Sequence, residues 1–284
     1  MPALLLCIPF LLQGAFSPPR QAGFPGFELV ESVPVETGLD NGHIRNTPEV
    51  WREMIGGARR TLEVEQFYIS SRPGTAFDSV LGEVRRAALR GVRVRILVDG
   101  RMYRTYPADV DSLGRSTNIA VRVLPHSRLS GGTQHAKFFV VDGEEVFLGS
   151  QNFDWRALDH IHELGLRVRD LRAAGWYGAI FETDWRLADT SGNPAPPPPP
   201  ERVSFSDLTL PGIPSDSLVF SPTGSPRHLI PHPGGWDEPA IVRLLDEARR
   251  DVCMHFLTFS PLVRGGSRYD ALAGAMRRAA APGV

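Results

Sequence analysis

One short segment of the chain combines a histidine, a lysine and an aspartate at spacings that suit chemistry on an anionic group. His135 is followed by Lys137 two positions later and by Asp142 five positions after that. Lys137 is the only lysine, and the other thirty of the thirty-one basic residues are arginines. A lysine ammonium is a compact point charge with three rotatable donors, which suits binding of a phosphate oxygen. The segment therefore indicates chemistry on a phosphate.

The neighbouring polar residues fit an attack on a phosphodiester. A neutral imidazole is a suitable nucleophile, because a phosphodiester repels anionic ones. We expect His135 to attack phosphorus and form a phosphohistidine, which water or an alcohol then releases. Lys137, Ser150 and Asn152 would donate hydrogen bonds to the charged phosphate oxygens. The scheme requires no metal and no other cofactor, and no cluster of metal-ligating residues at a suitable spacing accompanies the segment.

The candidate residues follow one another in a fixed order, which is His135-x-Lys137-(x)4-Asp142-(x)6-Gly149-Ser150-x-Asn152. This pattern resembles the HKD motif of the phospholipase D superfamily. In that family two HKD halves pack so that two histidines face each other across one pocket, one as nucleophile and the other as general acid. The resemblance also implies that Glu163, which lies 28 residues after His135, is an acid that orients the nucleophilic imidazole.

Other segments resemble one branch of that superfamily, which holds mammalian endolysosomal phospholipase-D-like 5′-exonucleases and poxvirus envelope phospholipase-like proteins. The segments are Leu29-Val-Glu-Ser-Val, Gly149-Ser-Gln-Asn-Phe-Asp-Trp-Arg156, Glu163-Leu-Gly165 and Ile180-Phe-Glu-Thr-Asp-Trp185. The resemblance implies a phosphodiesterase, with phospholipid headgroups favoured as substrate. The alternatives are a single-stranded nucleic-acid 5′-exonuclease, a phosphatidyltransferase of the cardiolipin synthase type, and a truncated binding relic without catalysis. We expect a second HKD half from a missing C-terminal region or from a homodimer partner.

Charge distribution bears on the nucleic-acid alternative. The net charge is −1, so no global basic field gathers nucleic acid. A local track remains open as a hypothesis, because arginines alternate on the strand near residue 95 and an Arg/Tyr loop follows it. Its members are Arg93, Arg95, Arg101, Tyr103, Arg104 and Tyr106. Basic side chains interleaved with aromatic rings would bind an extended strand of nucleotides.

The hydrophobic periodicity predicts the elements that position these residues. A helix is expected over 47–58, with Thr47 as its N-cap. A strand over 61–69, a helix over 76–89 and a strand over 92–98 follow it. This order predicts a β-α-β unit with a parallel sheet. Further strands are expected over 120–124, 136–141, 146–148 and 164–168, with a helix over 171–187. Asp142-Gly143 predicts a hairpin turn. The aspartate would then have either a structural role in this turn or a catalytic one. The fold class is α/β, with a mixed sheet flanked by helices.

The sequence predicts four regions. Residues 1–22 are apolar and resemble a signal peptide, which favours a secreted or periplasmic protein over a cytoplasmic one. Residues 23–193 form the first HKD domain and 194–236 a proline-rich linker with a connecting segment. Residues 237–284 repeat the helix-strand-helix order of the first domain, and we interpret them as the truncated start of a second one, of lower stability.

In that repeat, residues 251–260 correspond to the strand that begins at Thr61, with His255 aligned to Glu65 and Cys253 as a buried hydrophobe.

Overall fold

The computed structural model describes residues 26–188, 207–211, 217–254, 259–262 and 268–281. The predicted signal peptide and the polyproline run lie outside the described residues, and so does His255. None of the helices in the described part of the chain has the length and apolar character needed to span a bilayer. The division into domains, the signal peptide and the lower stability of 237–284 stay predictions.

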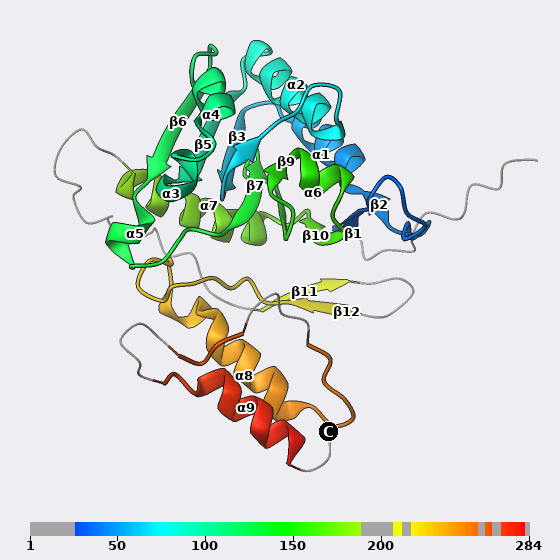
Figure 1. The fold of residues 1–284 in the computed structure, drawn as a ribbon, viewed down its shortest axis with the longest axis vertical. Helices are drawn as coiled ribbons and strands as arrows, with labels where there is room; N and C mark the ends of the chain where they lie inside the picture. The colour runs from blue at the N-terminus through cyan, green and yellow to red at the C-terminus, as the bar shows by residue number, and fades with distance from the viewer. Residues whose placement is uncertain (1–25, 189–206, 212–216, 255–258, 263–267, 282–284) are drawn as a thin grey trace, which may run out of the picture.

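The main feature is an eight-stranded sheet (Figure 1), which is mixed as the sequence predicted. Its strands, in spatial order, are β2 (Arg45–Asn46), β1 (Phe27–Ser32), β10 (Glu163–Val168), β8 (Glu145–Gly149), β7 (Lys137–Val141), β3 (Thr61–Gln66), β5 (Arg93–Asp99) and β6 (Ile119–Leu124). β3, β5 and β6 are parallel to one another, and β2 is parallel to β1. The pairs β3–β7, β7–β8, β8–β10 and β10–β1 are antiparallel. The α/β class is therefore confirmed.

Helices cover both faces of the sheet (Figure 1). Those in the described part of the first domain are α1 (Thr47–Gly57), α2 (Ala76–Leu89), α3 (Gly100–Tyr103), α4 (Pro107–Gly114), α5 (His126–Leu129), α6 (Trp155–Asp159) and α7 (Leu171–Leu187). Alternation along β3 separates the two faces: Leu62 and Val64 pack under α1 and α2, while Glu63 and Glu65 point toward the α7 face.

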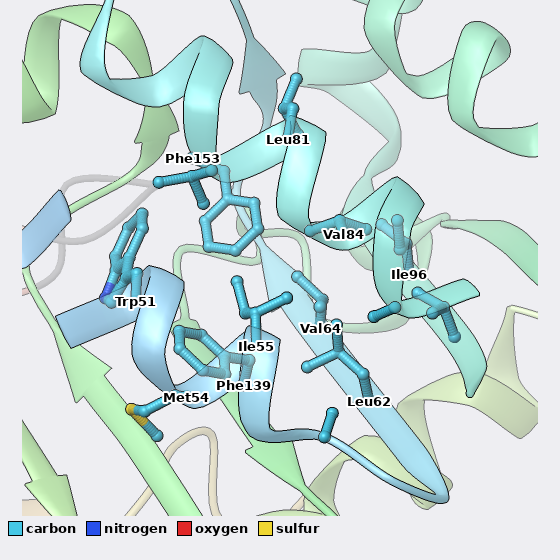
Figure 2. Close-up of a cluster of buried hydrophobic side chains, with 14 of the residues drawn as sticks. Trp51, Met54, Ile55, Leu62, Val64, Leu81, Val84, Ile96, Phe139 and Phe153 are labelled. Atoms are coloured by element: carbon cyan, nitrogen blue, oxygen red, sulfur yellow. The ribbon is translucent and has the colours of Figure 1, made fainter. Parts of the chain in front are cut away.

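The core under α1 and α2 is aromatic at its centre. Trp51 packs against Phe139 and Phe153, with ring centroids 5.9 and 4.8 Å away (Figure 2). It also packs against Phe147, with ring centroids 5.2 Å away. All four side chains are at most 1% exposed. This packing holds β7, β8 and the segment after β8 against α1, so the strands that carry the candidate site residues rest on a rigid base.

The hairpin between β7 and β8 forms where Asp142-Gly143 predicted it. Asp142 has φ 56° and Gly143 has φ 68°, the positive pair that a type I′ turn requires. The Glu144 N–H donates to the Val141 carbonyl at 2.9 Å and closes the turn.

Several boundaries differ from the prediction. The strand expected over 61–69 ends at Gln66, and Ile69–Ser70 forms β4, which pairs with β9 (Phe153–Asp154) in a separate two-stranded sheet. Asn46, not Thr47, occupies the N-cap of α1. The Thr47 hydroxyl is buried and instead accepts a hydrogen bond from Gln151 at 3.1 Å, which explains why it does not cap the helix.

The second repeat differs most. Its helices form as α8 (Asp237–Glu247) and α9 (Ala271–Ala280), beside a hairpin of β11 (Leu208–Pro211) and β12 (Ser217–Phe220). The expected strand over 251–260 is absent from its described residues, 251–254 and 259–260, and Cys253 is exposed. β3 has hydrogen-bonded neighbours on both sides, whereas the described residues of 237–284 offer this segment no such partner.

Candidate active site

His135 and Lys137 lie at the start of β7, beside the carboxyl end of β3. The antiparallel register pairs Lys137 with Gln66, the last residue of β3. β5 ends at the same edge with Asp99, because it runs parallel to β3. The carboxyl edge of parallel strands is where α/β sheets usually place ligands. The candidate residues are therefore collected at a favourable edge of the sheet.

Lys137 is buried to an unusual degree for a lysine, with 8% of its surface exposed. Its Nζ donates to the His135 carbonyl oxygen at 2.7 Å and lies 5.2 Å from the centre of the Phe67 ring. Burial lowers the pKa of the ammonium to about 8, and the nearby Glu163 carboxylate opposes that shift. Lys137 thus presents a poorly solvated cation, which would gain much from a phosphate oxygen.

The His135 side chain remains accessible to solvent and rests edge-on against Phe67, with ring centroids 4.5 Å apart. Partial burial of the imidazole lowers its pKa below the usual value, the Lys137 charge lowers it further, and Asp99 acts in the opposite direction. The lowered pKa favours the neutral form of the ring. A neutral and accessible imidazole is the form that a nucleophile requires.

Glu163 lies close enough to Lys137 for their charges to interact. Burial raises the pKa of Glu163 to about 7, Lys137 opposes the shift, and Asp154 adds to it. The Oε2 atom is buried and has no hydrogen-bond partner among the described residues. The expected bond from Glu163 to His135 is not present there, so orientation of the imidazole by Glu163 stays a prediction. The acid instead faces the ammonium.

The two predicted phosphate donors after β8 differ in availability. The Ser150 N–H donates to the Leu164 carbonyl oxygen at 3.0 Å, so this backbone donor is not free for phosphate. The exposed Ser150 hydroxyl makes only long contacts of 3.3 Å with the Leu164 backbone. Asn152 is half-buried, and its Oδ1 has no partner in the described structure. An amide oxygen is an acceptor, so donation by the Asn152 amide N–H group to a phosphate stays a prediction.

Asp142 is not brought together with the other candidates. It follows β7 at the end opposite Lys137. Its carboxylate accepts the backbone N–H groups of Arg59, Arg60 and Thr61 at 2.9, 2.7 and 2.8 Å, and these bonds hold its pKa below the usual value against a desolvation effect. The grouping of Asp142 with the catalytic residues is corrected on this point: its contacts tie the β7–β8 turn to the start of β3.

Sequence reasoning missed two glutamines beneath the site. Gln66 accepts the Phe153 N–H at 3.1 Å, and Gln151, fully buried, bonds Thr47. A Cβ on Gly149 would lie 2.3 Å from the Gln151 Oε1, and one on Gly165 would lie 2.9 Å from it. The glycine of the motif is therefore needed to seat Gln151. Only the β8–β10 register, which pairs Gly149 with Gly165, reveals this requirement.

The Arg/Tyr track is only partly assembled. Arg95 is bonded to Glu63 and Glu182 and is not free to bind an anion, which corrects that part of the expectation. The Tyr103 hydroxyl donates to Asp111 at 2.7 Å. Tyr106, by contrast, stacks on Tyr68, with ring centroids 4.8 Å apart and planes inclined by 21°.

Arg156 lies over the Tyr106 ring at 5.8 Å and over the Trp155 ring at 5.2 Å. Aromatic and cationic groups do gather here: Tyr106 is one of the predicted residues, whereas Tyr68, Trp155 and Arg156 were not predicted.

Residues 51–185 match the family model described as "Cardiolipin synthase, PLD-like domain". Residues 51–185 form a phospholipase D-like domain. The match spans β3, β7 and β10 and so includes all the candidate residues of this phospholipase D-like domain.

Curated relatives of the domain are similar over longer stretches. The virion nicking-joining enzyme of vaccinia virus (strain Copenhagen) is 33% identical over 164 residues, which cover 56% of this chain and 38% of that protein. The 5'-3' exonuclease PLD3 of Bos taurus is 28% identical over 276 residues, which cover 89% of this chain and 55% of that protein. The chain therefore spans about half the length, or less, of these relatives. Among solved structures, the phospholipase D family member Nuc from Salmonella typhimurium matches with a TM-score of 0.45 and 18% identity, over 57% of this chain and 95% of that chain.

Proposed function

We propose that the chain contributes one catalytic half of a phosphodiester hydrolase whose nucleophile is His135. The observation that carries the proposal is the placement of the only lysine. Lys137 is buried, hydrogen-bonded to the His135 carbonyl and poorly solvated, directly beside an accessible imidazole with a lowered pKa. A cation that is costly to bury needs an anionic partner, and the described residues supply only Glu163, whose own pKa is raised.

The proposed reaction has two steps. A ring nitrogen of His135 forms a bond to phosphorus while the bond from phosphorus to the leaving oxygen breaks, and the leaving oxygen takes up a proton. Water then attacks the phosphohistidine, the P–N bond breaks, and a phosphate monoester and a proton are released. Lys137 and the Asn152 amide stabilise the charge on the nonbridging oxygens in both steps. The proton for the leaving group comes from a second HKD half, supplied by a C-terminal continuation or by a second copy of the chain.

The test is hydrolysis of bis(p-nitrophenyl) phosphate by a protein that contains both halves, with and without EDTA. We expect His135→Ala to abolish turnover and EDTA to leave it unchanged. His43→Ala is the matched control, because His43 is exposed and lies outside the site. An acid-labile p-nitrophenyl phosphate adduct on the His135 peptide should be visible by mass spectrometry in the wild type. Retained activity in His135→Ala, or loss of activity in EDTA, contradicts the proposal.

The substrate has two candidates. The superfamily resemblance favoured a phospholipid headgroup, and that prediction stays untested. The names of the relatives, an exonuclease and a nicking-joining enzyme, favour a nucleic-acid phosphodiester. The Tyr68–Tyr106 stack beside Arg156 supports the second candidate, because nucleobases stack on such groups.

Parallel incubation with phosphatidylcholine vesicles and with 5′-hydroxyl single-stranded DNA separates the two candidates. Mononucleotide release without choline or phosphatidic acid selects nucleic acid, and the reverse selects lipid.

A further inference from the structure

Two carboxyl groups are buried against each other on the face of the sheet opposite Lys137. Glu65, on β3, is 1% exposed, and Asp184, on α7, is 7% exposed. Their side chains are within hydrogen-bonding reach of one another. Two carboxylates in such contact cannot both be ionised without a large electrostatic cost, so the pair retains a proton. Neither group takes part in the proposed reaction.

The pair is connected to the nucleophile by a single residue. The Glu65 Oε1 accepts a hydrogen bond from the Gln134 Nε2 at 2.9 Å. The Gln134 backbone N–H donates to the Asp99 carboxylate at 3.1 Å. Gln134 is 4% exposed and directly precedes His135 in the chain. Gln134, which precedes the nucleophile, is thus bonded through its side chain to Glu65 and through its backbone N–H to Asp99.

A cavity of about 580 Å³ lies beside this connection. Glu65, Asp184, Gln134 and His135 all line it, together with apolar side chains of α7 and of the segment 223–230. Among the described residues, the Glu65 Oε2, the Asp184 Oδ1 and the Gln134 Oε1 have no hydrogen-bond partner. The cavity gives these side chains room to move apart. A close-packed wall would leave them no such room.

The other titratable groups on this face do not neutralise the pair. Burial raises the pKa of both Glu65 and Asp184, and the Asp184 charge raises that of Glu65 further. His126, which faces the same cavity from α5, has its pKa lowered by burial. The Tyr177 pKa is raised by burial, so its hydroxyl keeps its proton at neutral pH.

The charges on neighbouring elements do not neutralise the pair either. Arg95 on β5 is taken up by Glu63 of β3 and Glu182 of α7, and Asp99 at the end of β5 adds a negative charge. Arg95 is therefore not available to compensate a second negative charge on the pair.

We propose that Glu65 and Asp184 are positioning residues that hold His135 in place through Gln134 while they share a proton, and that loss of this proton confines phosphodiester hydrolysis to acidic and neutral pH. The inference rests on the proposed function of His135. When the pair is protonated, Glu65 and Asp184 bond each other and Glu65 accepts from Gln134. When both carboxyls ionise, repulsion drives one of them toward the cavity, and Gln134 loses its acceptor. Burial lowers the pKa of His135, which favours the neutral form of the nucleophile.

The pH dependence of kcat for bis(p-nitrophenyl) phosphate tests the inference on the protein that contains both halves. The wild-type rate should fall as pH rises above neutrality. Glu65→Gln keeps an acceptor for Gln134 and a donor for Asp184 but cannot ionise, so its alkaline limb should move upward by at least one pH unit. Glu65→Ala should lower kcat about tenfold or more at every pH, with KM within threefold, since positioning and not binding is lost. Glu63→Gln, on the same strand and face, should reproduce the wild-type profile.

A second readout separates failure of this inference from failure of the proposed function. Thermal unfolding of Glu65→Gln should show a smaller loss of Tm between pH 5 and pH 8 than the wild type. This difference does not require the protein to be active. No hydrolysis by the wild type refutes the proposed function, while the unfolding comparison still tests the shared proton. An alkaline limb at the same pH in the wild type, Glu65→Gln and Asp184→Asn, or parallel Tm profiles, overturns the inference.

Discussion

Replacement of Lys137 by methionine separates what this side chain does for activity from what it does for stability. Methionine keeps the unbranched apolar stem but lacks the ammonium. The Nζ atom lies 2.7 Å from the His135 carbonyl oxygen and 5.2 Å from the centre of the Phe67 ring, a site where a thioether methyl packs well. We expect Lys137→Met to fold, to lose nearly all activity and to be at least as stable as the wild type near neutral pH.

The expected magnitudes come from burial. The pKa of Lys137 falls from 10.5 to about 8, which corresponds to about 3 kcal/mol of cost to keep the ammonium charged in the folded protein. The folded protein binds fewer protons than the unfolded chain between pH 8 and 10.5, so this group's contribution to stability improves as pH rises through that window. For activity, loss of one donor to a developing oxyanion typically costs about 10²- to 10³-fold in kcat.

Two measurements check this reasoning. Hydrolysis of bis(p-nitrophenyl) phosphate at pH 6.5 should fall at least 100-fold in Lys137→Met. Lys137→Arg should lose a similar factor, because the larger guanidinium does not fit the buried position, although arginine is this chain's usual cation. Unfolding at pH 7.5 and pH 9.5 should show a gain of stability in the wild type that Lys137→Met lacks. A Lys137→Met protein that is less stable by several kcal/mol at pH 7.5, or an active Lys137→Arg, would refute the reasoning.

Three further predictions concern the framework of the site. Asp142→Ala should destabilise the protein by about 2 kcal/mol, measured by urea denaturation, because three backbone N–H groups lose their acceptor, while the folded fraction keeps its kcat. Gly165→Ala should cost about 2–3 kcal/mol, since a Cβ would lie 2.4 Å from a phenylalanine ring, whereas Gly178→Ala in α7 meets no atom within 4 Å and should be neutral or stabilising. Limited proteolysis should cut the chain between 189 and 236 and leave a resistant piece over 28–190, and a single resistant unit that extends to 284 would contradict the predicted division.

Local patterns were sufficient to predict most elements of the first domain. The helix over 171–187 has the predicted bounds, because one face of it is apolar at helical spacing and Asp170 caps it through its own side chain. Asp142-Gly143 predicted the hairpin because these two residues tolerate positive φ better than others do. The prediction of a strand over 251–260 was wrong for the described residues, 251–254 and 259–260. A strand is stabilised by partner strands, which its own sequence does not contain.

The chemistry of the site could likewise be inferred from residue types, but its geometry could not. The sequence by itself determined that one lysine follows a histidine at the start of a buried strand, and this indicated phosphate chemistry before any contact was known. Tertiary structure decided that the Asp142 carboxylate bonds the backbone at the start of β3, that Arg95 pairs with two glutamates, and that Glu65 meets Asp184. Glu65 and Asp184 are more than one hundred residues apart and meet only because α7 packs across β3. Burial raises the pKa of such a pair. Burial depends on packing between distant segments and not on local sequence.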